Sequence, residues 1–148
     1  MADLVTTITE SVVLNGSVRG STNTVTTTGI NNAYERIVTC THSQETTLVA
    51  FNTNSYGAVV QLDKEDVRYI RVTNLNATIS VELAVVGAAT LYQVTLKAGQ
   101  SHILGAADNI MLAEADTDPS FGTMAALQNI IVKPVGTTNV DLEVFVAS

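Results

Sequence analysis

The sequence predicts an all-β fold, and three observations support this prediction. The 148-residue chain contains 21 Thr and 20 Val, whose β-branched side chains favour pleated surfaces. Only 14% of its residues are charged, whereas amphipathic helices usually carry many Glu and Lys residues on their solvent face. Short alternating segments recur along the chain, separated by turn residues. We therefore expect one domain spanning residues 1–148, a single jelly-roll-like β-sandwich of about eight to ten strands.

The first part of the chain is rich in Thr and less regular than the rest. Apolar residues at even positions of 4–14 predict a strand, and Asn15-Gly16 is a strong tight-turn dipeptide. Segment 19–33 has almost no apolar residues that could anchor it in a core, so the sequence is consistent with either an exposed edge strand or a mobile loop there. Because core-forming residues are sparse, we interpret residues 1–14 as an N-terminal strand or an arm laid against a neighbouring subunit.

Strand signals continue through the middle of the chain. Loose alternation predicts strands at 34–41, 46–51, 67–73 and 90–96. The most regular segment is 78–86, where Ile, Val and Leu occupy every second position, as in a strand with one buried face.

Three further strands are expected near the end of the chain. Segments 109–112 and 129–133 are short, and Pro134 ends the second of them because proline cannot donate to a ladder. Segment 139–147 alternates as strictly as the best central strand, with Val and Leu at every second position.

Charge and cysteine content narrow the possible partners. The net charge is -7 and the seven basic residues are scattered, which argues against direct nucleic-acid binding. Neither a signal peptide nor a membrane-spanning segment is expected, since the chain lacks a basic start followed by a long apolar run. Cys40 is the single cysteine and is interpreted as a small buried hydrophobe, which suits synthesis in a reducing cytoplasm.

No residue pattern points to catalysis, a cofactor or a metal. His42 and His102 are the two histidines, and no Gly-x-Ser-x-Gly elbow accompanies them, so we interpret both as strand-end polar residues. Asp116 and Asp118, with Glu114 nearby, lack the central Gly and the final Glu of a calcium loop and are better explained as a solvated acidic loop. The sequence therefore predicts a protein that is not an enzyme.

One part of the chain is similar to a known family. Residues 67–104 contain a strand that ends Arg71-x-x-Asn74-Leu75, then a regular strand, then the turn Leu96-x-Ala98-Gly99-x-Ser101, and a C-terminal alternating strand follows at 140–146. This order resembles head decoration (cement) proteins of tailed bacteriophages and related small virion β-sandwich proteins, over about half of the chain. In this motif, Asn74 and Gly99 are expected to be turn residues that tolerate left-handed backbone.

The resemblance implies a structural protein of the virion. Such a protein would bind the major capsid protein on the outside of the assembled head, commonly as a homotrimer, and would be made in the host cytoplasm. The low charged fraction suits a surface that lies against other protein.

Two other functions stay open at this stage. The chain could be a fibre or tail-associated module that binds a host-surface glycan through a concave polar patch with exposed Tyr. Less favoured is a small hydrolase built on His42 or His102.

The contact surface is expected in the irregular segments. One part is the N-terminal segment 4–14, and another is the long loop 113–127, with one helical turn near 124–127. The interface residues predicted on this basis are Leu4, Ile8, Val12, Tyr34, Tyr56, Phe121, Met124 and Leu127.

Overall fold

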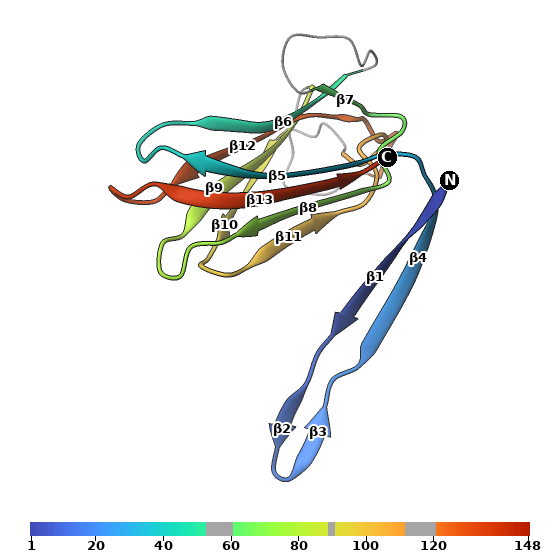
Figure 1. Ribbon diagram of the computed structural model, residues 1–148, viewed down its shortest axis with the longest axis vertical. Helices are drawn as coiled ribbons and strands as arrows, with labels where there is room; N and C mark the ends of the chain where they lie inside the picture. Colours follow the sequence, from blue (N-terminus) through green and yellow to red (C-terminus); the bar gives the residue numbers. More distant parts are fainter. Residues whose placement is uncertain (53–60, 89–90, 112–120) are drawn as a thin grey trace.

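The computed structural model describes residues 1–52, 61–88, 91–111 and 121–148. Within these ranges the protein is all-β and contains no helix, which confirms the predicted fold class. The chain forms two packed sheets and a separate two-stranded ribbon that projects away from them (Figure 1).

Two sheets make up the body of the molecule, which is a sandwich. The four-stranded sheet has the order β11(Ser101–Leu104), β8(Tyr69–Asn74), β13(Val140–Ala147), β5(Ala33–Cys40). The five-stranded sheet has the order β10(Leu91–Leu96), β9(Val81–Gly87), β12(Leu127–Pro134), β6(Thr46–Asn52), β7(Gln61–Asp63). All pairings are antiparallel except the parallel pair β6–β7. Most connections cross from one sheet to the other, and this order is compatible with the expected jelly roll.

The core lies between the inner faces of the two sheets. Alternate residues of β9 and β13 point inward, so these two strands show the strict alternation expected from the sequence. Their inward residues Leu83, Val85, Leu142 and Val144 are fully buried. Cys40 is also 0% exposed and belongs to the same core, as predicted.

The N-terminal part forms an arm of residues 1–30 outside this core. Strands β1(Ala2–Thr9) and β4(Thr22–Ile30) pair antiparallel along its length, and β2(Val12–Leu14) pairs with β3(Ser17–Arg19) at its far end. The turn between β2 and β3 is Asn15-Gly16, with φ of 50° and 78°, as expected for a tight hairpin turn. Segment 19–33 is therefore mostly an edge strand of this arm.

Three expectations about local structure are wrong. The predicted strand 4–14 is two strands, because Glu10 and Ser11 interrupt it. At 109–112, the described residues form only an isolated bridge, between Met111 and Ala125. No helical turn forms at 124–127, because the amides of Met111 and Leu127 donate to carbonyls of Ala125 and Ala107 in extended pairing. Of the predicted loop 113–127, residues 113–120 lie outside the described ranges.

Candidate functional site

The arm carries an unusual amount of exposed apolar surface for a two-stranded ribbon. Opposite residues of its two strands share a face, so Leu4, Ile8 and Val25 lie on one side and Val5 on the other. Val5, Ile8 and Val25 are 59%, 48% and 62% exposed. Along the Val5 side, Thr side chains pair across the strands, with Oγ1 atoms 3.1 Å apart for Thr7 and Thr24.

The arm tip, residues 10–21, is apolar on both of its faces. Val12, Leu14 and Arg19 lie on one face, while Val13 and Val18 form a cross-strand pair on the other. The four apolar side chains of the tip are all exposed, between 49% for Val12 and 71% for Val18. A solvated hairpin tip would normally carry polar residues here, so this composition indicates a surface that becomes covered.

A close backbone approach joins the tip to the rest of the arm. Gly20 has a φ of 122°, and a Cβ atom at this position would lie 2.1 Å from the carbonyl oxygen of Glu10. The Glu10 amide donates to the Ser21 carbonyl at 2.9 Å, which holds the two strands together at this irregular point. Only glycine fits the observed backbone, so Gly20 is a structural requirement of the arm.

The arm is anchored where it enters the sandwich. The amides of Asn31 and Asn32 both donate to the Ser148 carbonyl at 2.7 Å, and the Ser148 amide donates back to the Asn32 carbonyl at 2.9 Å. Ile30, at the end of β4, is buried. These contacts fix the base of the arm while leaving its length free of the core.

A groove of about 370 Å³ separates the arm from the outer face of the four-stranded sheet. Residues Leu4 to Ile8 of the arm line one wall, and Tyr69, Arg71, Ile103 and Phe145 line the other. On the sheet side, Arg71 pairs with Glu143 at 2.8 Å and lies 5.9 Å from the centre of the Phe145 ring. Arg71 is therefore already paired within the chain.

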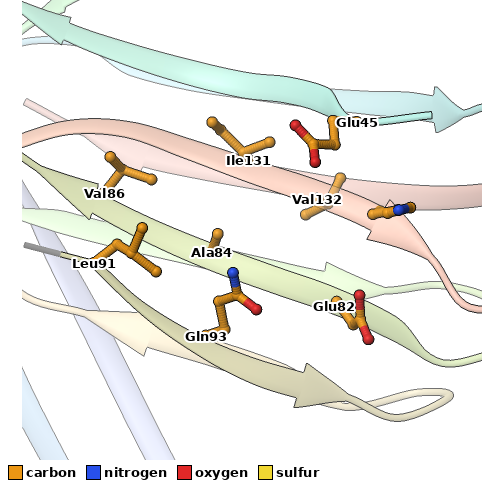
Figure 2. A pocket seen from close by; sticks show the side chains of 9 residues that line it. Glu45, Glu82, Ala84, Val86, Leu91, Gln93, Ile131 and Val132 are labelled. Carbon is orange, nitrogen blue, oxygen red and sulfur yellow. The ribbon is translucent and has the colours of Figure 1, made fainter.

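The outer face of the five-stranded sheet contains a second concave site, which we call the hollow (Figure 2). Its volume is about 280 Å³, and Ala84, Val86, Leu91 and Ile131 supply its apolar floor. The hollow forms because the small side chain of Ala84 lies between larger neighbours, as Figure 2 shows. Its polar lining residues are Glu45, Glu82, Gln93 and Lys133.

The charges around the hollow are not balanced. Lys133 lies directly opposite Glu82 in the β12–β9 pairing, and on its other side the pairing of Val132 with Thr46 continues toward Glu45, so two carboxylates flank one ammonium group. In the part of the chain that the structure describes, the single ion pair is Arg71–Glu143, on the other sheet. The hollow therefore presents an apolar floor beside one negative charge in excess.

The two segments of the motif that resembles decoration proteins, one at Asn74 and one at 96–101, lie next to each other in the structure. Asn74 is fully buried, and its Nδ2 donates to the carbonyls of Ile79 at 2.8 Å and Leu96 at 3.1 Å. Its Oδ1 accepts the Asn76 amide at 3.0 Å, and the Gly99 amide donates to its carbonyl at 3.0 Å. Asn74 thus joins the two motif segments as a hydrogen-bonding centre.

The backbone geometry of this motif corrects one of our expectations. Gly99 adopts the expected left-handed conformation, with a φ of 73°, but Asn74 does not have a positive φ. Asn74 is therefore not a left-handed turn residue, and its side chain has the structural role instead.

The two histidines do not form a catalytic arrangement with each other. His42 follows β5 and contacts Asn139, while His102 lies on β11, at the opposite edge of the four-stranded sheet. His102 Nε2 is 3.0 Å from the Tyr92 hydroxyl, and this contact links the two sheets at their β10–β11 edge. Burial lowers the pKa of His102 and raises the pKa of Tyr92. Among the described residues, no group of three or more His, Cys, Asp or Glu could hold a metal ion.

The predicted interface residues fall into three groups. Leu4, Ile8 and Val12 lie on the arm, and Phe121 and Met124 are exposed on the sandwich, at 92% and 41%. Leu127 and Tyr34 form the third group: Leu127 is 1% exposed in the core, and Tyr34 packs partly buried against it. Tyr56 lies outside the described residues.

Sequence reasoning missed the second half of the arm and the hollow. The apolar run Val12-Val13-Leu14, immediately before Asn15-Gly16, was an available signal for an apolar hairpin tip. The hollow left no such signal, because it is formed by residues of β9, β10 and β12 that are distant in the chain.

No protein-family model, curated protein or solved structure matches the chain. None of the described residues forms a helix that is long and apolar enough to cross a membrane.

Proposed function

We propose that this protein is a non-enzymatic structural protein of a bacteriophage virion. In this proposal it is a decoration (cement) protein that binds the outer surface of the head, with the major capsid protein and other copies of itself as partners. The observation that carries the proposal is the arm, whose exposed apolar residues project from a rigid β-sandwich (Figure 1).

The physical argument concerns the stability of the arm. A two-stranded ribbon is marginally stable in water unless its apolar face is covered. Apart from Ile30 at its base, the arm supplies no buried apolar side chain, so its own sandwich does not provide that cover. Apolar cover must then come from another protein surface, as in the interfaces of an assembly.

The alternative function, glycan binding by a fibre module, has less support. It calls for a concave polar patch with exposed Tyr. Among the described residues, no aromatic side chain lines the hollow, and Tyr69 in the groove beside the arm is only partly exposed. Within the described ranges, Tyr92 is the only Tyr among the exposed large side chains, at 37%, and its hydroxyl already contacts His102.

Particle survival tests the proposal. Purified particles with and without the protein are heated, or transferred to low salt, and the intact fraction is counted. Particles that carry the protein should survive better, and restoring the purified protein should restore survival. Unchanged survival would remove the cement proposal, and a copy number far below that of the major capsid protein would favour the fibre alternative.

A matched pair of variants assigns the effect to the arm. Leu14→Asp places a charge on the arm tip, whereas Val135→Asp places one on an exposed valine of the β12–β13 turn, where the native side chain is 47% exposed. Leu14→Asp should abolish protection of the particle and Val135→Asp should preserve it. Equal effects of the two variants would contradict a role for the arm.

A further inference from the structure

We propose that the arm tip of one copy of this protein docks in the hollow of a second copy. This inference deepens the proposed function, since it rests on the arm being an assembly element and names the surface that covers it. Both surfaces are exposed in the free chain, and both are apolar centres flanked by charged residues.

The apolar parts fit by size. One face of the tip presents Val12 and Leu14, and the floor of the hollow presents Ala84, Val86 and Leu91. An enclosed apolar cavity of about 150 Å³ accommodates a benzene ring. The hollow, at about 280 Å³, has room for branched side chains of the tip.

The charges are complementary. Arg19 lies on the same face of the tip as Val12 and Leu14, and it is the only basic residue of the arm. Two carboxylates and one ammonium group line the hollow, and Lys133 lies opposite Glu82. Because Lys133 lies between Glu45 and Glu82, one negative charge of the hollow is left for Arg19 of an incoming tip, and we place this contact at Glu45, just before β6. Complementary charges of this kind set the register of an interface more than its affinity.

The geometry excludes docking within one copy. The groove at the base of the arm faces the outer side of the four-stranded sheet, and the hollow lies on the outer side of the other sheet. The arm leads away from the sandwich toward its tip (Figure 1). Residues 2–14 extend roughly 40 Å at about 3.3 Å per residue, which is long enough to reach an adjacent molecule.

The tip and the hollow are different patches of the same chain. A contact between them is heterologous, so each copy donates one arm and receives one. Such contacts close into a ring when the rotation between neighbours allows it. The expected assembly is a closed ring of copies linked by their arms.

A charge exchange tests the pairing of Arg19 with Glu45. The oligomeric state of the full-length protein, purified without capsids, is followed by sedimentation velocity over a range of concentrations. Arg19→Glu and Glu45→Arg should each weaken self-association roughly tenfold, because each opposes like charges. The double variant should return to within about threefold of the original affinity.

The matched control is Glu35→Arg. Glu35 is an exposed carboxylate on β5 of the four-stranded sheet, so the same charge change there should leave self-association unaltered. Loss of association in this control, or failure of the double variant to recover, would overturn the pairing.

Cross-linking in trans tests the contact directly. A Leu14→Cys protein is mixed with an Ala84→Cys protein that carries a mass tag, and disulfide formation is induced. The native Cys40 is 0% exposed and is left in place. A tagged heterodimer is expected. When Ile37→Cys replaces Ala84→Cys, no heterodimer is expected, because Ile37 is 62% exposed on β5 of the other sheet.

The outcomes separate this inference from the proposed function. A chain that stays monomeric to millimolar concentration, or a tip that cross-links only to capsid protein, overturns docking in a second copy. Neither result contradicts the cement function, because the protein could still protect particles in the survival experiment. Conversely, ring formation without any protection of particles would support the docking and contradict the cement function.

Discussion

At the scale of single residues, one buried polar side chain connects several segments of the fold through hydrogen bonds. Asn74 is the one fully buried polar residue among those described, and its side-chain amide makes three hydrogen bonds to backbone groups. Removal of the amide would leave the Leu96 carbonyl buried without this partner and the Ile79 carbonyl and Asn76 amide partly buried without it. The residue thus couples the end of β8 to the β8–β9 loop and to the end of β10.

Replacement of Asn74 by Ala should be strongly destabilising. Leaving buried donors and acceptors unpaired costs about 1–3 kcal/mol per group, so we expect a loss of about 3 kcal/mol in the free energy of unfolding. Urea denaturation followed by far-UV circular dichroism measures it. Asn23→Ala, at an exposed position of the arm, should change the same quantity by less than about 0.5 kcal/mol. A loss below about 1 kcal/mol for Asn74→Ala would contradict this role.

His102 should make stability depend on pH. Its pKa is lowered from the ordinary value of 6.5 by burial, so the unfolded chain binds a proton more readily than the folded chain. Stability is fully present above about pH 6.5 and falls as the pH drops below that value through the lowered folded-state pKa. Thermal melting between pH 7 and pH 5 measures this dependence.

The other histidine provides the control for this prediction. His102→Gln should flatten the decline in melting temperature over that interval, because Gln does not titrate. His42→Gln is the matched replacement at the other histidine, which is exposed beside Asn139. A decline of equal size in all three proteins would assign the effect to other groups.

At the scale of elements, the strands differ in how firmly the sequence specifies them. Strands β9 and β13 lie at inner positions of their sheets with one buried face, so their side chains must alternate and the pattern is visible. The strands of the arm have no buried face, so their Thr-rich sequence shows no clear alternation and does not distinguish a strand from a loop. Their pairing is specified instead by turn chemistry at Asn15-Gly16 and by Gly20.

Gly20→Ala should disrupt the arm without unfolding the sandwich. The added Cβ would collide with the Glu10 carbonyl, and the φ of 122° is unfavourable for alanine. We expect amide hydrogens of β2 and β3 to exchange markedly faster, with an unchanged melting temperature of the sandwich. Gly105→Ala is the control, because a Cβ there meets no atom within 4 Å. Unchanged exchange at the tip would show that the close approach is dispensable.

At the scale of the whole molecule, the apolar residues fall into two groups, those in the core of the sandwich and those on the arm. The inward-facing ones of both sheets form one core, while most of those of the arm, apart from Ile30 at its base, are exposed. The sandwich can therefore hold its shape alone, and the arm can be devoted to a partner. The expected contact segment 4–14 is placed on this arm, but the expected contact residue Leu127 is taken up by the core.

Deletion of residues 2–29 should separate these two uses. No member of the core cluster lies in the deleted segment, so the free energy of unfolding should change by less than about 1 kcal/mol. Particle binding, measured by co-sedimentation with heads that lack the protein, should be lost. A large loss of stability on deletion would show instead that the arm supports its own sandwich.

The sequence by itself determined the fold class, the most regular strands, the burial of Cys40 and the tight turn at Asn15-Gly16. All of these depend on local propensity or on an alternation that one buried face imposes. Only the tertiary structure decided that 1–30 forms a projecting ribbon, that Asn74 joins three segments through its side chain, and that three strands create the hollow. The reason is physical. These features depend on which segments become neighbours in the fold, and the pairing of segments that are distant in the sequence is not visible in the local periodicity of their residues.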